Sequence, residues 1–367
     1  MAEFLAIQNG AADDAPGGGF TLRPPLADAH RRIDTYRPAD GLVEAMDVAM
    51  LLGVPLLLTG EPGTGKTQAA YWLAAELGRP LLRYNVKSGT TGSDLLYSFD
   101  EVARFRDASS REVRPLIDYV RFNALGLAIL RGGGSAGKLT DMLGQPLSHE
   151  AMVRAFGGAI IKSDPTARML VPSDAAFASA APEHCVVLID ELDKAPRDTP
   201  NDLLAEIETM RFAIPELGVM VPAGSRRPIV ILTSNSERSL PEPFLRRCAY
   251  FDIPFPREAE LARIVSDTLD VPPGTPPLTP ESPLVGSAVS VFLSVHDDPQ
   301  VRKRPGTAEL LAWVDILLAR ERLSPAQTLA QQMTAKPGAI ERTLCALLKS
   351  RDDLDVGLRA LRQAPAG

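Results

Sequence analysis

The pattern of apolar and polar positions along the chain predicts a sheet whose strands are covered on both faces. Five short apolar segments look like strands, and most of them are continuous apolar runs without the period of two that a half-exposed strand shows. Helical patterns lie between several of them, at 67–77 and 198–210. Strands that alternate with helices favour a parallel sheet inside an α/β sandwich. The expected strands are 54–59, 80–86, 185–189, 228–233 and 250–254.

Helical patterns flank these strands on both sides. A helix is expected before the first strand, from Asp40 as the N-cap to Gly53 as the C-terminal stop. Beyond residue 256 the pattern is helical only, which predicts a small all-helical domain at 257–367. The expected helices of that domain are 257–269, 284–296, 307–322, 326–334 and 339–350.

Other parts of the chain differ from these two regions. Residues 1–20 are acidic and rich in glycine, so we expect a flexible tail before an α/β domain at 21–256. Within that domain, residues 131–182 contain three consecutive glycines near their start and show weak periodicity, which indicates an insertion. Residues 210–215 and 219–222 fit a β-hairpin.

Composition narrows the class of ligand and the compartment. Apolar residues make up 45% of the chain and charged residues 23%, as in globular proteins with a substantial core. The net charge of −7 argues against nucleic acid as the main ligand, because binding its backbone needs a clustered positive surface. The first residues lack the pattern of a signal peptide, and no apolar run reaches roughly 18 residues, so we expect a cytoplasmic protein. Cys185, Cys248 and Cys345 are far apart, which suits buried thiols in a reducing compartment.

A glycine-rich loop follows the first predicted strand. Residues 60–67 fit the pattern GxxxxGK[ST] between a strand and a helix. Glycines let backbone N–H groups curl around phosphate oxygens, and the helix N-terminus adds the positive end of its dipole. Lys66 is placed for the β- and γ-phosphates, and the Thr67 hydroxyl for Mg²⁺. The expected nucleotide-binding residues are Gly60, Glu61, Pro62, Gly63, Thr64, Gly65, Lys66 and Thr67.

Two other predicted strands end in polar residues. The strand at 185–189 is followed by Asp190 and Glu191. In a P-loop enzyme the first acid holds Mg²⁺ through water, and the second orients and deprotonates the attacking water. The strand at 228–233 leads to Asn235, which is expected to hydrogen-bond that water or the γ-phosphate. The alternatives are a pair of acids at a helix start and an ordinary turn residue.

Together these motifs resemble the AAA+ ATPases, and more narrowly their MoxR-like branch. The resemblance implies a P-loop sheet of strand order 5-1-4-3-2 between helices, with a helical lid. It also implies a ring, usually a hexamer, that binds ATP and Mg²⁺ at subunit interfaces. The segments that carry it are GEPGTGKT (60–67), SGTTGSDLLYSFDEVARF (88–105), VVLIDELDKA (186–195), ILTSN (231–235), LPEPFLRRCAYFDIPFP (240–256) and KRPGTAELLAW (303–313).

The resemblance also implies roles for individual residues. Arg247 occupies the position of the family's arginine finger, with Arg246 as the competitor, and such a residue stabilises transition-state charge on a neighbouring subunit's nucleotide. Arg304 or Lys303 occupies the sensor 2 region. Surface ion pairs and a solvated charge run are the alternatives for these residues. The other matches are Lys66 and Thr67 with Walker A, Asp190 and Glu191 with Walker B, Asn235 with sensor 1, Tyr36 and Arg37 with the region near the adenine, and Asn85 with a restraint on Glu191.

Three functions remain open on these grounds. The resemblance implies a chaperone that uses ATP to remodel a protein client, often with a von Willebrand A-domain protein as partner. The second function is a nucleic-acid motor, in which basic residues of the segment 131–182 form a pore loop. The third is an assembly module in which nucleotide binding, rather than turnover, organises a ring. The acidic composition favours the protein client.

Overall fold

The structure is a computed structural model that describes residues 33–110, 114–157, 165–171, 177, 180–235, 240–272 and 274–364. The expected tail at 1–20 and part of the expected insertion lie outside these residues. The contacts divide the chain into two compact units. The sheet unit consists of Pro38–Gly60 and Gly65–Pro254, and the helical unit takes in the described residues before Pro38, Glu61–Thr64 and the chain from Phe255 onward.

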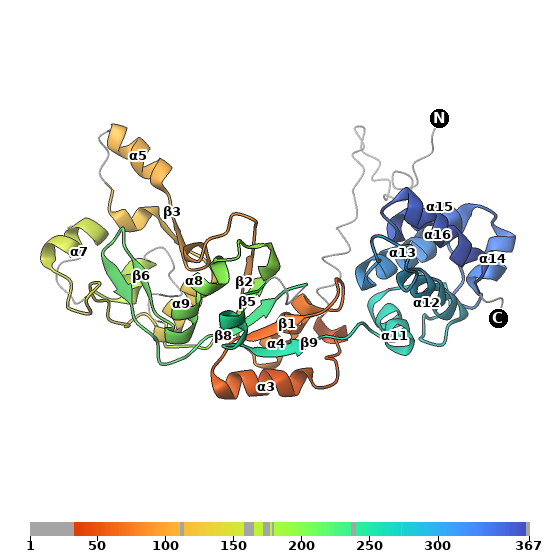
Figure 1. The fold of residues 1–367 in the computed structure, drawn as a ribbon, viewed down its shortest axis with the longest axis horizontal. Coiled ribbons are helices and arrows are strands. Elements are labelled where there is room, and N and C mark those ends of the chain that lie inside the picture. Colours follow the sequence, from red (N-terminus) through yellow and green to blue (C-terminus); the bar gives the residue numbers. More distant parts are fainter. Residues whose placement is uncertain are drawn as a thin grey trace. The chain divides into compact units, whose positions relative to one another are not determined.

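A five-stranded parallel sheet forms the centre of the sheet unit (Figure 1). Its order is β2-β5-β8-β1-β9, which is 5-1-4-3-2 when the strands are counted along the chain. This is the sheet of the AAA+ P-loop NTPase fold, and the predicted order is confirmed. The strands are β1 (Leu56–Thr59), β2 (Leu81–Asn85), β5 (Val186–Asp190), β8 (Ile229–Thr233) and β9 (Ala249–Asp252).

The central strands are the ones that helices cover on both faces. Every residue of β1 and β5 is buried, and so is β8 apart from Ile229. The edge strands β2 and β9 are partly exposed, so the expectation of two covered faces holds for the three central strands. Helices packed over the middle of a sheet leave its edges more open to water. For this reason a charged residue, Arg83, is tolerated inside β2.

Among the described helices, α3 (Leu42–Leu52), α4 (Lys66–Glu76) and α6 (Ala124–Gly133) make the main contacts with the sheet. The helix α3 contacts β9 and β1, α4 contacts β5, and α6 contacts β2 and β5. Gly41, with φ of 84°, is the N-cap of α3, so the assignment of Asp40 is wrong. The predicted helix 198–210 is divided into α8 (Thr199–Asp202) and α9 (Leu204–Thr209).

Further elements extend the sheet unit away from the central sheet (Figure 1). The predicted hairpin is present as the antiparallel strands β6 and β7. A second antiparallel pair, β3 and β4, is joined through the helix α5, and the sequence pattern did not predict it. The insertion was expected to begin at residue 131, but α6 continues to Gly133. The bounds are β3 (Tyr97–Phe99), α5 (Glu101–Ser110), η3 (Leu116–Tyr119), β4 (Val120–Phe122), α7 (His149–Phe156), β6 (Phe212–Ile214) and β7 (Val219–Val221).

The helical unit has its own core, centred on α12 and α13. Trp313 is fully buried there, and its indole Nε1 donates a hydrogen bond to Thr343 Oγ1 at 2.8 Å. The last helix, α16, was not predicted. It contains Gly357, which weakens the helical pattern but lets the side chain of Leu348 approach closely. The helices are η1 (Ile33–Thr35), α11 (Glu258–Thr268), α12 (Pro283–His296), α13 (Thr307–Ala319), α14 (Leu329–Ala335), α15 (Ala339–Leu347) and α16 (Arg351–Arg362).

Two further expectations concern the burial of the cysteines and the presence of membrane-spanning helices. Cys185 is buried and Cys248 is half-buried, whereas Cys345 is exposed, so the expectation of three buried thiols is wrong for Cys345. In the described part of the chain, no helix has both the length and the apolar character needed to cross a membrane.

Candidate functional site

The loop after β1 turns on glycines. Gly60, Gly63 and Gly65 have φ of 135°, 86° and 88°, a region that side chains with a Cβ disfavour. The helix α4 begins at Lys66, directly after Gly65. Its first backbone N–H groups have no partner inside the helix, which makes a helix start of this kind suited to an anion.

Lys66 places a buried ammonium group at this loop. The residue is 8% exposed, and Nζ donates a hydrogen bond to the carbonyl oxygen of Gly60 at 2.7 Å. Burial lowers the pKa of Lys66, while the negative charges of Asp193 and Asp190 act in the opposite direction. A cation that is held beside three left-handed glycines can bind phosphate oxygens.

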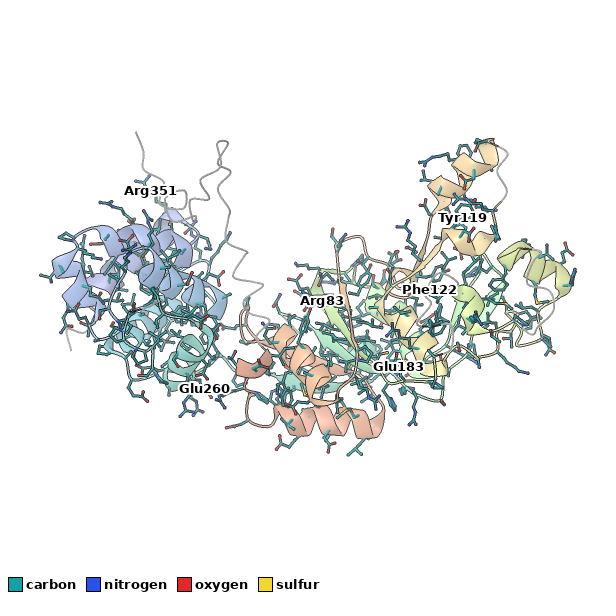
Figure 2. All side chains as sticks on the ribbon, turned by 180° about the vertical axis from the view of Figure 1, so that it is seen from behind. Arg83, Tyr119, Phe122, Glu183, Glu260 and Arg351 are labelled. Atoms are coloured by element: carbon teal, nitrogen blue, oxygen red, sulfur yellow. The ribbon has the colours of Figure 1, made fainter. Side chains whose placement is uncertain are left out.

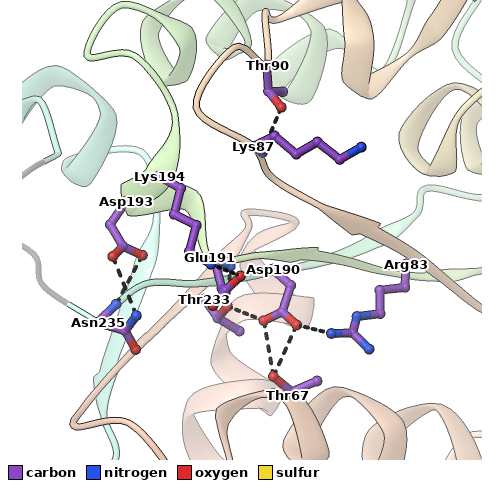
Figure 3. A network of polar contacts seen from close by, with 10 residues as sticks. All are labelled: Thr67, Arg83, Lys87, Thr90, Asp190, Glu191, Asp193, Lys194, Thr233 and Asn235. Carbon is purple, nitrogen blue, oxygen red and sulfur yellow. Dashed lines mark hydrogen bonds and ion pairs between the residues drawn. The ribbon is translucent and has the colours of Figure 1, made fainter. Parts of the chain in front are cut away.

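The carboxylate of Asp190 is the centre of a polar network (Figure 3). Its Oδ1 accepts hydrogen bonds from Thr233 Oγ1 at 2.6 Å and Thr67 Oγ1 at 3.1 Å. Its Oδ2 accepts from Arg83 Nη2 at 2.7 Å and from Thr67 at 3.2 Å. The carboxyl ends of β2, β5 and β8 meet here because the strands are parallel and in register, with Asn85 opposite Asp190. Thus Thr67 and Asp190, predicted as one metal site, do lie in contact.

Arg83 and Thr233 are members of this network that the sequence analysis missed. An arginine within the apolar strand 81–85 was the available signal for the first, and a threonine at the end of a buried strand was the signal for the second. Burial by itself lowers the pKa of Arg83, but hydrogen bonds from its guanidinium to Tyr71 and Asp190 outweigh burial and raise it. Arg83 therefore carries its charge beside Asp190.

Glu191 has an unusual backbone conformation. Its φ of 61° and ψ of 49° are left-handed, which costs a non-glycine residue about 1 kcal/mol or more, and such strain tends to cluster at functional sites. Its N–H donates to Thr233 Oγ1 at 2.9 Å, which holds this turn in place. Its carboxylate pairs with Lys194 Nζ at 2.5 Å, and this hydrogen bond raises the pKa of Lys194. Lys194 is a partner of Glu191 that the sequence did not indicate, and the restraint expected from Asn85 stays a prediction.

Asn235 follows β8 and contacts the segment that follows Glu191. Its backbone N–H donates to Asp193 Oδ1 at 3.3 Å, and its Nδ2 lies 3.5 Å from Asp193 Oδ2. Figure 3 shows Asn235 and Asp193 beside Glu191 and Asp190. Asn235 was expected beside the acidic strand, whereas its contact with Asp193 was not expected.

The two arginines after α10 (Glu242–Leu245) have partners outside the Asp190 network. Arg247 Nε lies 2.5 Å from Glu208 Oε1, and its Nη1 donates to the carbonyl oxygen of Pro243 at 3.3 Å. Arg246 pairs with Glu242 and is 76% exposed. Both arginines line a cavity of about 250 Å³. The other lining residues are Gly53, Val54, Pro55, Leu204, Ile207, Glu208, Arg227 and Phe244.

Glu61 is bound by two basic side chains of the helical unit, to which residues 61–64 belong by their contacts. Glu61 Oε2 lies 3.2 Å from His296 Nε2, and Oε1 lies 3.7 Å from Arg304 Nη1. His296 is buried and stacks on Phe255, with the ring centroids 4.0 Å apart. Arg304 is a candidate for sensor 2 by its sequence position, whereas no motif in the sequence indicated His296.

Backbone packing in the helical unit also explains two glycines. A Cβ at Gly63 would lie 2.7 Å from the backbone nitrogen of Thr307. A Cβ at Gly306 would lie 2.6 Å from the carbonyl oxygen of Pro62. Within the helical unit, the backbone at Gly306 and Thr307 therefore approaches the backbone at Pro62 and Gly63 closely. Arg37, expected near an adenine, is 3.6 Å from Asp267 of α11.

The donor set at Asp190 suits a hard cation. Mg²⁺ prefers oxygen ligands and usually takes one or two from the protein, completing its coordination with water and phosphate. The hydroxyl of Thr67 and the carboxylate of Asp190 supply such oxygens at the edge of the glycine-rich loop. These residues fit a magnesium ion that binds together with a phosphorylated ligand.

Comparison with known proteins gives a partial match. Residues 55–132 match the family described as AAA domain (dynein-related subfamily), and this span includes the glycine-rich loop. No curated protein is detectably similar in sequence to the chain. Among solved structures, a point mutant of RuvB from Thermotoga maritima is similar, with 14% sequence identity and a TM-score of 0.42. That similarity covers 93% of this chain and 73% of the RuvB chain.

Proposed function

We propose that this chain is a magnesium-dependent ATPase of the MoxR-like AAA+ type, which works in a ring and remodels a protein partner. The Asp190 network is the observation that carries the ATPase proposal, because it joins Asp190, the last residue of β5, to the Thr67 hydroxyl in the first turn of α4. The match of residues 55–132 to an AAA domain supports it independently. ATP is preferred over GTP on the family resemblance alone.

The residues of the loop would bind the triphosphate. Gly60 to Thr67, apart from Pro62, supply backbone N–H groups, and Lys66 supplies the charge that phosphate oxygens require. Thr67 and Asp190 would hold Mg²⁺, which neutralises phosphate charge when it is bound. Arg304 lies 3.7 Å from Glu61, and this contact supports our assignment of the sensor 2 role to Arg304 rather than to Lys303.

Catalysis would depend on Glu191 and Asn235. Glu191 is the proposed general base, and its ion pair with Lys194 has to open before the carboxylate can accept a proton from water. Asn235 and its partner Asp193 lie on the same side, where they can orient that water. The strained turn at Glu191 keeps its carboxylate close to the site.

Exposed apolar residues on the sheet unit support assembly into a ring. Four large apolar side chains of α3 are exposed, and groups of this kind mark contact surfaces on soluble proteins. The C-terminal end of α3 leads directly into Gly53, Val54 and Pro55, which line the cavity with Arg246 and Arg247. The arginines thus lie next to a surface suited to a second copy of the chain. The exposed residues are Val43, Val48, Leu51 and Leu52.

The helix α5 offers a surface for the protein partner. It extends from the body of the sheet unit (Figure 1), and Val102 and Phe105 are 70% and 76% exposed one turn apart. Its buried residue Asp107 attaches the helix to the rest of the sheet unit. Asp107 accepts a hydrogen bond from Tyr119 at 2.8 Å and pairs with Arg114. Figure 2 shows Tyr119 at the base of this element. A fixed helix with an exposed aromatic side chain is a typical anchor for another protein.

Glu191→Gln tests whether turnover or only binding of ATP is needed. We expect it to keep nucleotide affinity and to reduce the hydrolysis rate by about 100-fold or more, since it removes the general base. Phosphate release and nucleotide binding are the two measurements, with Glu206→Gln as a matched control on α9. Full biological activity of the Glu191→Gln protein without hydrolysis would favour the assembly module instead.

A Val102→Ser, Phe105→Ser double variant tests the partner surface. We expect it to weaken co-purification of the protein partner by about tenfold or more, because an exposed aromatic anchor often contributes about 2 kcal/mol or more. Basal ATP hydrolysis should be unchanged. Leu143→Ser, at another exposed apolar position, serves as the control. Equal recovery of the partner with all three proteins would reject α5 as the contact.

The nucleic-acid motor is the second candidate. Arg104 and Arg106 are exposed on the same helix, which is the observation that favours it. Stimulation of ATP hydrolysis by DNA, falling steeply as salt rises, would identify this function. The net charge of −7 favours the protein partner.

A further inference from the structure

Arg83 is a charged residue within an edge strand, and its side chain reaches the most buried acid of the site. It lies on β2 opposite Leu188, two positions before the pair Asn85 and Asp190. Its side chain is 36% exposed, whereas that of Asp190 is 5% exposed. The guanidinium therefore extends from the edge of the sheet to a carboxylate inside it, with Nη2 and Oδ2 2.7 Å apart.

The contacts of Asp190 differ in strength and in origin. An ionised carboxylate has about four acceptor positions, and here four contacts occupy them. Thr233 holds Oδ1 at 2.6 Å from β8, and Arg83 holds Oδ2 at 2.7 Å from β2. The Thr67 hydroxyl is divided between the two oxygens at 3.1 and 3.2 Å. Thr67 is thus the contact that can most easily turn away, and it is also the one expected to bind the metal.

We propose that Arg83 is a positioning residue, which fixes the Asp190 carboxylate and keeps free divalent cations from binding there before the nucleotide does. This inference rests on the proposed function of the site. Arginine retains its charge at all ordinary pH values. A fixed positive charge beside the carboxylate repels Mg²⁺, whereas the phosphates of a nucleotide bring negative charge that offsets this repulsion. The cation then enters together with the nucleotide.

Titration of the nucleotide-free protein with MnCl₂, followed by electron paramagnetic resonance, tests the proposal. Wild type should bind Mn²⁺ weakly. Arg83→Gln and Arg83→Met, which remove the charge, should bind it about tenfold more tightly, because the repulsion between the guanidinium and the cation is lost. Arg83→Lys keeps the charge and should stay close to wild type. Arg79→Gln removes a nearby arginine just before β2 and is the matched control.

Nucleotide binding provides a second measurement. The coupling between two ligands is reciprocal. If the nucleotide-free protein binds the cation more tightly, MgCl₂ should therefore increase the affinity for a fluorescent ADP analogue by a smaller factor. We expect this effect to shrink by about the same factor in Arg83→Gln as Mn²⁺ binding tightens. Arg83→Lys should retain the full effect of MgCl₂.

The outcomes separate this inference from the function on which it rests. Mn²⁺ affinity that is unchanged or weaker in both Arg83→Gln and Arg83→Met would overturn the role of Arg83, even if the protein binds ATP. A wild-type protein that binds no nucleotide would overturn the proposed function, while the Mn²⁺ titration would still report on Arg83. Thermal melting of each variant establishes that it is folded, and the two neutral substitutions give independent opportunities for a folded protein.

Discussion

Arg247→Ala is expected to remove ATP hydrolysis and to leave nucleotide binding nearly intact. An arginine that reaches a neighbouring subunit's nucleotide stabilises charge in the transition state, which is worth about 10³–10⁵ in rate in other nucleotide hydrolases. Among the described residues of one chain, the guanidinium of Arg247 contacts Glu208 on α9 and the carbonyl oxygen of Pro243 on α10. Loss of that ion pair costs little stability, about 0–1 kcal/mol, because both partners are half-exposed.

Arg246→Ala is the matched control for this prediction. Arg246 is the adjacent arginine and lines the same cavity, but its partner is Glu242, the first residue of α10. Steady-state phosphate release and the dissociation constant for ADP are the two measurements for both variants. If Arg246→Ala loses hydrolysis and Arg247→Ala does not, the two assignments are exchanged. Normal hydrolysis by Arg247→Ala and Arg246→Ala alike would show that neither acts as the finger.

Mixing of two inactive variants tests whether the arginine acts between subunits. Arg247→Ala retains an intact loop, and Lys66→Ala retains an intact Arg247. In a mixed ring, the arginine of a Lys66→Ala subunit can reach the nucleotide of an Arg247→Ala neighbour, so part of the activity should return. Mixtures that remain inactive at every ratio would exclude action across a subunit interface.

Lys66→Ala is expected to abolish nucleotide binding. The ammonium group is buried, and in this structure its hydrogen bond goes to the Gly60 carbonyl at the start of the loop. Two hydrogen bonds from a charged group to phosphate contribute about 1.5–3 kcal/mol each, so their loss weakens binding by about 100-fold or more. Equilibrium titration with a fluorescent ATP analogue measures the effect.

The control for the lysine variant is Lys87→Ala. Lys87 follows β2 and lies near the same edge of the sheet, as Figure 3 shows, but it is exposed. Its removal should leave affinity within about twofold of wild type, as expected for an exposed charge in water. A Lys66→Ala protein that melts as wild type does and still binds ATP at wild-type affinity would show that the loop does not hold the triphosphate.

The amino-acid sequence by itself determined the sheet and the loop. Runs of apolar residues at 54–59, 185–189 and 228–233 can be buried only if they are covered on both faces, and the structure places all three at the centre of the sheet. The strand order came from the family resemblance rather than from the pattern, since periodicity does not say which strands are neighbours. The glycines at 60, 63 and 65 specified a turn that only glycine adopts readily.

The tertiary structure decided which side chains surround the acids. Arg83 and Asp190 are 107 positions apart, and Thr233 is 43 positions beyond Asp190, so no local pattern connects them. They meet because the carboxyl ends of three parallel strands lie side by side. Hydrogen bonds between the strands set this register. The pairing of Glu191 with Lys194 depended in the same way on a left-handed turn that the sequence did not reveal. Local composition thus specified the strands and the turn, and the contacts between distant segments specified the charges around the site.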